Sequence, residues 1–185
     1  MRRILAVGLA LFIFLILPHS TQAEETADLT AYVKIQRLSV AISPDEYDFG
    51  VMTAGSRKVA DSYIAVTNDG NVTERFKLWI TEEPNGTWVS VTDGTVDAEE
   101  YRLSAIFKNG APLSDDYGFE DSFSVSMERI ASDTDLAKDS DPAGEKGYNV
   151  TENTWRKLWF KFEAPSETDI TTQQAITVRI TASPN

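Results

Sequence analysis

The sequence predicts an all-β fold, an antiparallel β-sandwich of about 7–9 strands with an extended N-terminal strand. Apolar and polar residues alternate in seven or eight short stretches, which is the period of a strand with one buried face. Turn-forming residues separate these stretches, as in the "NDGN" at 68–71 and the "KNG" at 108–110. The sequence shows neither a helical apolar period nor a repeat of about 20–50 residues, so helical and repeat folds are not favoured.

The first 23 residues have the pattern of a secretory signal peptide. Arg2 and Arg3 precede an uncharged apolar run over residues 4–17, and the small residue Ala23 offers a cleavage site. A membrane anchor is the alternative, but this run of 14 residues is shorter than the ~20 that span a bilayer. We therefore expect a secreted protein, extracellular or at the cell surface, whose mature chain has no membrane span.

The mature chain opens on a long alternating stretch, "TADLTAYVKIQRLSVAIS" at residues 26–43. Its apolar residues share one parity in the first half and the other parity in the second: Leu29, Ala31, Val33 and Ile35, then Leu38, Val40 and Ile42. The alternating part has about 14 residues, whereas a strand usually has about 5–6. Either the strand crosses between the two sheets at a bulge, or residues 24–37 form an arm that completes the sheet of a neighbouring copy. The second interpretation leaves residues 38–185 as the domain.

Further strands are predicted over residues 58–67, 72–80, 87–91, 101–107, 123–127, 156–163 and 174–181. Residues 68–71 should join the first two of these in a hairpin, because Gly70 can adopt positive φ at little cost. Residues 131–147 lose all periodicity and are rich in Asp, Ser and Gly, so we expect a loop there. With 42% hydrophobic residues and four Trp, the chain can form a core without disulfides.

The composition excludes several kinds of chemistry. The chain has no Cys, and its one His, His19, lies in the predicted signal peptide. Disulfides, zinc sites of the usual ligand types and Ser-His or Cys-His catalysis are therefore excluded from the mature chain. We expect no enzymatic activity and no catalytic residues. Without Arg2 and Arg3, 15 basic residues face 29 acidic ones, and this net charge of −14 argues against nucleic acid as a partner.

The stretch "SPDEYDFGVMTAGSRKVADSYIAVTNDGN" at residues 43–71 resembles the start of secreted or surface immunoglobulin-like domains. It combines a "DFG" turn, a second glycine turn and then "IAVTNDGN", and in this respect it is similar to the ASH/MSP/Hydin class of immunoglobulin-like modules. The "KLWFKFEAPSET" at residues 157–168 is also similar to segments of secreted bacterial immunoglobulin-like proteins. The resemblance implies an immunoglobulin-like sandwich that serves binding or assembly rather than catalysis.

Three tryptophans are candidate ligand or subunit contacts. Trp79, Trp155 and Trp159 lie opposite the apolar face of their predicted strands, and an outward-facing Trp indicates a contact. Flat aromatic rings beside polar groups are typical of carbohydrate binding, so polysaccharide is one candidate partner. The alternative, which we favour, is that a loop or a partner strand covers these side chains.

Calcium is the one cofactor that the sequence suggests. The acidic run at residues 132–145 could supply oxygen ligands through Asp133, Asp135, Asp139 and Asp141. Its spacing departs from the EF-hand loop, so only an irregular loop site would remain. The alternative, which we favour, is a hydrated acidic loop without metal.

Three Asn-x-Ser/Thr triplets are candidate glycosylation sites. They begin at Asn71, Asn85 and Asn149, and two of them fall in predicted turns. Triplets of this kind also arise by chance, so they indicate surface exposure more than a modification.

The first strand carries the functional expectation. Leu29, Ala31, Val33 and Ile35 are spaced for the pockets of a neighbouring sheet, and an arm that binds the next copy propagates head to tail. The sequence therefore favours a secreted, non-enzymatic subunit of an extracellular filament or surface assembly, a homo-oligomer or polymer joined by N-terminal strand donation. The alternative is a secreted carbohydrate- or surface-binding immunoglobulin-like module that uses exposed Trp side chains.

Overall fold

A computed structural model describes residues 30–84, 88–138 and 140–185. Its contacts divide the chain into two units, residues 1–34 and residues 35–185. The predicted signal peptide and the single positions Leu29, Asn85 and Asp139 lie outside the described residues. Of the first unit, residues 30–34 are described, and they form no helix or strand.

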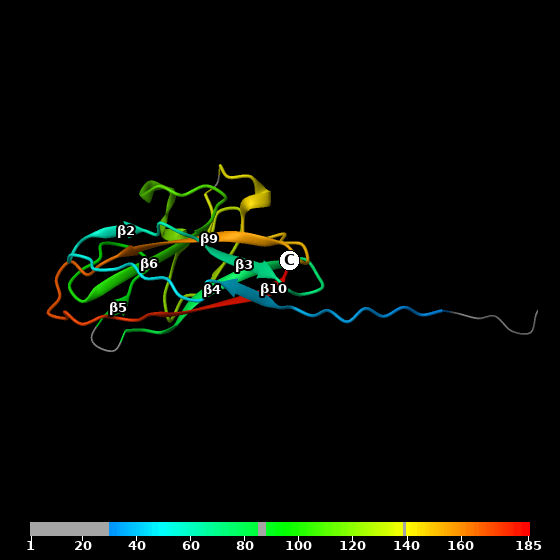
Figure 1. The fold of residues 1–185 in the computed structure, drawn as a ribbon, viewed down its shortest axis with the longest axis horizontal. Coiled ribbons are helices and arrows are strands. Elements are labelled where there is room, and N and C mark those ends of the chain that lie inside the picture. Colours follow the sequence, from blue (N-terminus) through cyan, green and yellow to red (C-terminus); the bar gives the residue numbers. More distant parts are fainter. Residues whose placement is uncertain (1–29, 85–87, 139) are drawn as a thin grey trace, which may run out of the picture. The chain divides into compact units, whose positions relative to one another are not determined.

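The second unit consists of two β-sheets (Figure 1). The strands are β1 (Val40–Ser43), β2 (Arg57–Val59), β3 (Ile64–Asn68), β4 (Glu74–Glu82), β5 (Val89–Ser90), β6 (Glu100–Phe107), β7 (Ser122–Phe123), β8 (Arg129–Ile130), β9 (Trp155–Glu163) and β10 (Thr177–Pro184). The larger sheet, sheet A, has the order β1–β3–β9–β6–β5, with β2 also paired to β9 and β7 to β6. Sheet B has the order β10–β4–β8.

The predicted fold class is confirmed. The described residues are all-β, and their two sheets pack against each other as a sandwich. Every strand pair among them is antiparallel except β5 with β6. Their helical elements are three single 3₁₀ turns, Ser114–Asp116, Phe119–Asp121 and Ala143–Glu145. None of the described helices has the length and apolar character needed to cross a membrane.

The core forms where the apolar faces of the two sheets meet. Burial alternates along β4, so Phe76, Leu78 and Ile80 are buried while the side chains between them are partly exposed. The three belong to one apolar cluster with residues of β3, β6 and β9. Full burial of such a side chain contributes about 1.5–3 kcal/mol, so this cluster can stabilise the fold without a disulfide.

The outer face of sheet A is covered as well. Residues 101–107 of β6 are all buried, although successive side chains of a strand point to opposite faces. Part of the chain between β6 and β9 folds over this outer face (Figure 1). We call residues 108–146 the covering segment; within it, β7 pairs with β6 and β8 pairs with β4 of sheet B. Its Phe119 ring lies 5.0 Å from the Arg102 guanidinium, and its Tyr117 ring lies 5.1 Å from the Lys161 ammonium. The sheet thus has an apolar core on one face and a mixed, largely polar layer on the other.

Four predicted strands are shorter than expected. Among the described residues, the long N-terminal strand forms only as β1 over Val40–Ser43, and the stretch 87–91 only as β5 over Val89–Ser90. Residues 58–67 form two strands, β2 and β3, which pair with different parts of β9. In the stretch 123–127, β7 ends at Phe123, and Val125 and Met127 are exposed. The alternation of apolar and polar residues predicted one continuous strand in each stretch. The backbone pairing with β9 and with β6 ends before the alternation does.

The hairpin predicted at residues 68–71 is wrong. β3 and β4 do not pair, and this turn carries the chain from sheet A to sheet B. Gly70 is required there for space rather than for positive φ, because a Cβ at this position would lie 2.5 Å from the carbonyl oxygen of Arg37. The turn therefore packs against the chain that leads into β1.

Candidate functional site

The sandwich has an open edge between β1 and β10, which we call the seam. Among the described residues, β1 pairs only with β3 at the edge of sheet A, and β10 pairs only with β4 at the edge of sheet B. The two edge strands approach each other, but no hydrogen-bonded ladder joins them in the described part of the chain. Each strand therefore presents unpaired backbone N–H and C=O groups along one side.

Side chains on both strands of the seam face the core and yet stay partly exposed. Residues directly opposite each other in an antiparallel pair point to the same face of the sheet. Ile42 of β1 lies opposite the fully buried Val66 but is itself 41% exposed. Ile180 of β10 lies opposite the fully buried Leu78 but is only partly buried. The core face of the sandwich is thus incompletely covered along the seam.

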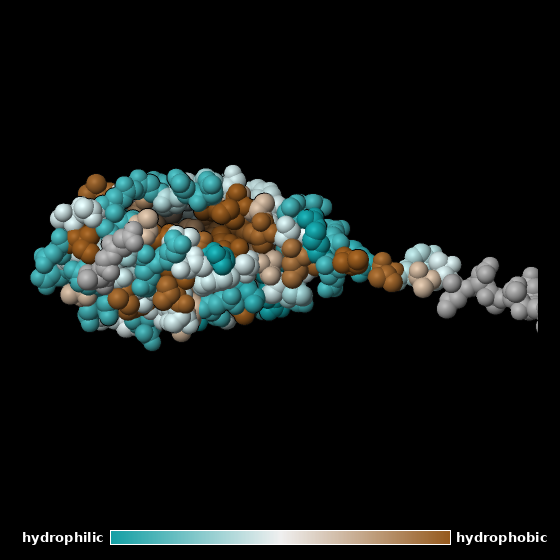
Figure 2. Space-filling model, turned by 90° about the horizontal axis from the view of Figure 1, so that it is seen from below, coloured by the Kyte–Doolittle hydropathy of each residue, from teal (hydrophilic) through white to brown (hydrophobic). Residues whose placement is uncertain are grey.

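Apolar side chains line this edge. The partly buried hydrophobic residues that pack against the core include Val40 of β1 and Val178 and Ile180 of β10. The others are Trp88, Ile176 just before β10, and Tyr47, Phe49 and Met52 in the chain after β1. The space-filling view shows apolar side chains gathered in a hollow on one face of the molecule (Figure 2). A contiguous apolar surface of this kind marks an interaction site more often than a free surface.

The turn at residues 68–71 holds the chain that leads into β1. The side chain of Asn71 accepts a hydrogen bond from the Arg37 N–H at 2.8 Å and donates one to the Ile35 carbonyl at 2.9 Å. The backbone N–H of Asn71 donates to the carbonyl of Arg37 at 3.0 Å. The Asn71 side chain therefore makes the hydrogen bonds that a neighbouring strand would otherwise make to residues 35–37. These residues run alongside the turn.

Glu74 is fully buried beside the same segment. Its Oε1 accepts the N–H of Ser39 at 3.0 Å, while Oε2 has no hydrogen-bond partner among the described residues. Burial raises the pKa of the Glu74 carboxyl, and the Ser39 N–H partly opposes this effect. A raised pKa means that the carboxyl is more readily protonated. Burying it beside the Ser39 N–H then costs less free energy than burying a charged carboxylate.

The predicted assembly strand is described in part. Val33 and Ile35 are 89% and 81% exposed, Ala31 is also exposed, and Leu29 lies outside the described residues. No strand or helix forms over residues 30–39. Exposed apolar side chains at every second position are the feature that a donated strand needs.

The three candidate tryptophans do not form one surface. Trp155 and Trp159 lie on β9 in sheet A, whereas Trp79 lies on β4 in sheet B. Trp159 is 6% exposed, and its indole N–H donates to the carbonyl of Lys108 at 2.8 Å. Trp155 is 48% exposed and stacks on Tyr63 with the ring centres 6.0 Å apart. Trp159 is therefore a covered side chain, and Trp155 with Tyr63 is an exposed aromatic pair.

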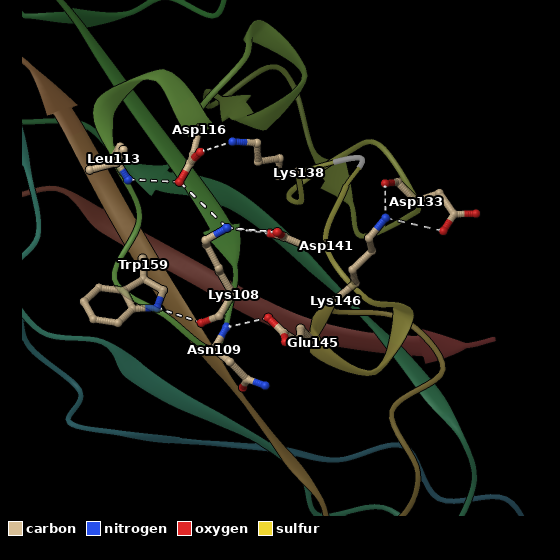
Figure 3. A network of polar contacts seen from close by, with 10 residues as sticks. All are labelled: Lys108, Asn109, Leu113, Asp116, Asp133, Lys138, Asp141, Glu145, Lys146 and Trp159. Atoms are coloured by element: carbon tan, nitrogen blue, oxygen red, sulfur yellow. Dashed lines mark hydrogen bonds and ion pairs between the residues drawn. The ribbon is translucent and has the colours of Figure 1, made fainter.

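The candidate calcium ligands pair with lysines or form hydrogen bonds within their own turns, and they do not gather around one point. Asp141 accepts a hydrogen bond from Lys108 at 2.9 Å, and Asp133 lies 3.6 Å from the Lys146 ammonium (Figure 3). Asp135 bonds within its own turn, where its N–H donates to the Ser132 hydroxyl. Within the described ranges, no group of three or more acidic or other usual ligands could hold a metal ion.

Lys108 is the centre of a polar network within the covering segment (Figure 3). Besides Asp141, its ammonium lies 3.8 Å from Asp116, which also pairs with Lys138. Burial works to raise the pKa of Asp116, but the bonds from Lys138 and the Leu113 N–H and the charge of Lys108 together lower it. The network therefore keeps Asp116 ionised and ties three parts of the covering segment together.

The candidate glycosylation sites differ in their surroundings. The amide of Asn71 is engaged in the bonds to residues 35–37, as described above. Asn149 is exposed, has a φ of 52° and exchanges hydrogen bonds with Asn185. Asn85 lies outside the described residues.

Sequence reasoning identified the apolar alternation of the N-terminal segment but missed the seam. Ile42 and Ile180 carry the same alternation as a covered strand, so the sequence gives no signal that their core side is open. The fold and the seam together define a two-sheet β-sandwich with an unclosed apolar edge. No protein-family model matches this chain, and a search of curated proteins finds no significant match.

Proposed function

We propose that this protein is a secreted, non-enzymatic structural subunit of an extracellular filament or surface assembly. Its copies join when the N-terminal segment of one copy adds a strand to the seam of the next. The observation that carries the proposal is the open seam, in which the core-facing Ile42 and Ile180 stay partly exposed. Closing such an edge with an apolar strand is favourable by about 25 cal/mol for each Å² of apolar surface buried.

The N-terminal segment has the chemistry that the seam lacks. Its apolar residues Leu29, Ala31, Val33 and Ile35 occupy every second position. β10 has 8 residues and presents its own partly buried apolar side chains on the core side of the seam. A strand of similar length can therefore place four apolar side chains over the core while its backbone pairs with an open edge.

The expected donor is a second copy of the chain. Residues 29–37, "LTAYVKIQR", contain no Gly, Pro, Asn or Asp, which are the residue types that form tight turns. Asn71 holds residues 35–37 alongside the turn that precedes β4. The sequence thus offers no bend that would return the segment to its own seam. A segment that enters the next copy makes a head-to-tail contact, which extends into an open filament.

Two single substitutions in the full chain test donor and acceptor separately. Val33→Asp places a charge on the donated strand, and Ile180→Asp places one in the seam. Each variant should fold and fail to form the filaments that the wild type forms under the electron microscope. Mixed together, they should form a one-to-one dimer, because the Ile180→Asp copy still donates and the Val33→Asp copy still accepts. Size-exclusion chromatography with light scattering measures the mixture.

Matched controls use neighbouring positions of the opposite parity. Tyr32→Asp and Thr181→Asp add the same charge to the other face of the segment and of β10, so both should assemble. Circular dichroism establishes that every variant is folded. Assembly that survives both core-facing substitutions, or a mixture of folded variants that stays monomeric, contradicts the proposal.

A second candidate function is favoured by one observation. The exposed stack of Trp155 on Tyr63, with the Lys157 ammonium 5.0 Å from the Tyr63 ring, is a flat aromatic surface beside a polar group. Such a surface suits a sugar ring, so the protein would be a secreted carbohydrate-binding module. The assembly test separates the two functions, because polysaccharide binding at Trp155 does not depend on Val33 or Ile180.

A further inference from the structure

β10 is the longer of the two open edges in the seam. It has 8 residues, whereas β1 has 4, and in the described part of the chain each pairs with one strand only. An added strand gains backbone hydrogen bonds along its whole length, so β10 offers it the longer ladder. Val178 and Ile180, which face the core, and Arg179 and Thr181, which face outward, would then lie beside the added strand.

The two strands of the seam run in opposite directions. The N–H of Ser39, which precedes β1, donates to the Glu74 side chain at 3.0 Å, and Glu74 lies opposite Pro184 at the end of β10. Asn71 holds residues 35–37 near this same end. The N-terminal segment therefore leaves the domain where β10 ends.

The direction of the donated strand decides between a filament and a closed pair. In an open filament, the segment leaves one copy at this end and enters the seam of the next copy from the opposite end, so it runs antiparallel to β10. In a closed pair related by a two-fold axis, it enters from the same end and runs parallel to β10. Antiparallel pairing is also slightly more stable per residue.

Arg179 is an exposed cation on this open edge. It lies opposite Trp79 on the outer face of sheet B, and its guanidinium is 5.8 Å from the centre of the Trp79 ring. Among the described residues it forms no ion pair with a carboxylate. When the apolar residues of the segment face the core, Thr30, Tyr32 and Lys34 face outward. An aromatic ring beside Arg179 adds a second cation–π contact, whereas a lysine beside it is repelled.

We propose that the segment pairs antiparallel with β10 of the next copy and that Tyr32 lies opposite Arg179, an inference that rests on the proposed strand donation. The guanidinium then lies between the rings of Trp79 and Tyr32. Lys34 falls in the same cross-strand row as the exposed Glu82, because Glu82 pairs with the first residue of β10. The outward faces of donor and acceptor are thus complementary in charge.

Other arrangements lose this complementarity. A shift of two residues brings either Lys34 or Thr30 opposite Arg179, which adds repulsion or loses the ring contact. The parallel arrangement with the same ring contact brings Lys34 into the row of Lys77, whose ammonium Glu128 already holds at 3.2 Å. The outward residues therefore favour the direction that extends into a filament.

Disulfide trapping locates the register, because the chain has no Cys of its own. Thr30→Cys is combined in the full chain with Thr181→Cys, with Ser183→Cys or with Thr177→Cys. The Cα atoms of directly opposite residues are about 4.5–5.5 Å apart, which is within disulfide range. Thr30 lies opposite Thr181 in the proposed register, so this pair should cross-link into a ladder that extends beyond the dimer on a non-reducing gel. The other two positions lie at least about 6.6 Å further along the strand and should cross-link little.

Assembly is measured separately, by light scattering and electron microscopy of the reduced proteins. Proteins that assemble but cross-link at Ser183, or at none of the three positions, overturn the register and leave the strand donation standing. Cross-linking at Thr177 that stops at the dimer shows a parallel, closed pair and overturns the direction. Absence of assembly in the wild type overturns the strand donation, and the register with it.

Substitutions without Cys test the ring contact itself. Arg179→Gln and Tyr32→Leu each remove one partner, so each should raise the protein concentration needed for assembly by about two- to fivefold. The two effects should not add in the double variant, because both remove the same contact. Arg57→Gln, which removes an exposed arginine from sheet A, is the control and should leave this concentration unchanged. Unchanged assembly in Arg179→Gln, or full additivity in the double variant, would also overturn the register.

Discussion

Asp121 shows how a single buried acid makes the fold sensitive to pH. Its carboxylate accepts the N–H groups of Gly118 at 2.8 Å and Ala137 at 3.0 Å, which joins two parts of the covering segment. Burial raises the pKa of Asp121 to about 7; the charges of Glu120 and Asp135 raise it further, while the two N–H groups oppose this. The folded protein therefore keeps this proton at pH values where the unfolded chain has already released it.

Asp121→Asn should remove this contribution. In the wild type, the free energy of unfolding should fall as the pH rises from about 4 to about 7, because the folded state must then bury a charged carboxylate. At about 1.4 kcal/mol for each pKa unit, the loss is of the order of a few kcal/mol. Asn has nearly the same shape as Asp but does not titrate, so the free energy of unfolding of the variant should lack this dependence on pH. Urea denaturation of both proteins across this pH range measures the difference, which isolates Asp121 because all other acids are shared. Parallel pH profiles would contradict the assignment.

The covering segment depends on ion pairs where the sandwich depends on apolar packing. Lys108, which begins the segment, bonds to Asp141 at 2.9 Å, and the N–H of Asn109 donates to Glu145 at 3.1 Å (Figure 3). Since the pKa of Asp116 is lowered in the folded protein, its contribution to stability is present at neutral pH and is lost as the pH falls through that lowered value. Acid should therefore loosen the covering segment before it affects the core between the sheets.

Lys108→Met tests the role of this network. The substitution keeps most of the aliphatic stem and leaves Asp116 and Asp141 without their shared cation, so it should cost about 2 kcal/mol of unfolding free energy. Hydrogen exchange should quicken at residues 114–121 and 140–146 and stay slow in β4. Lys138→Met is the control: its ammonium is more exposed, so the loss should be smaller. Equal losses in the two variants, or faster exchange in β4, would show that Lys108 acts elsewhere.

At the scale of elements, alternation was sufficient for the strands that carry the core. β4, β6, β9 and β10 lie within a few residues of the predicted stretches, because each has a strong apolar face that sheet pairing uses. The turn at residues 68–71 could not be predicted, because "NDGN" suits a hairpin and a crossing between sheets equally well. The position of Arg37, which is distant in sequence, decides between them.

Of the two surfaces in the candidate site, only the N-terminal segment could be predicted from the sequence. The alternation of Ala31, Val33 and Ile35 is visible in the sequence, since it needs no knowledge of the fold. The open seam is not, because alternation indicates which face of β10 is apolar and not whether a further strand lies over it. The burial of Arg102 and Lys161 was also hidden: both residues are on strands, where a charged side chain usually indicates a solvent face, and the covering segment buries them.

For the molecule as a whole, charge and apolar surface act in opposite directions on self-association. After loss of the predicted signal peptide, 15 basic residues face 29 acidic ones, so two copies repel each other at long range. In the proposed assembly, the seam and the N-terminal segment would attract at short range through apolar contact, which salt does not weaken. The proposed assembly therefore should be slow at low ionic strength and favoured when salt screens the repulsion.

The rate of assembly should accordingly rise, by roughly tenfold, between about 0.01 M and 0.15 M sodium chloride, because the screening length shortens from about 30 Å to about 8 Å. Light scattering of the wild type after dilution from a monomeric stock measures this rate, and the Val33→Asp variant supplies the baseline. Magnesium and calcium chloride at equal ionic strength should act alike if screening is the cause. An increase specific to calcium would show that screening is not the cause. A rate that falls with salt would mean that the copies join through charge complementarity, and the apolar seam would then not be the surface that brings them together.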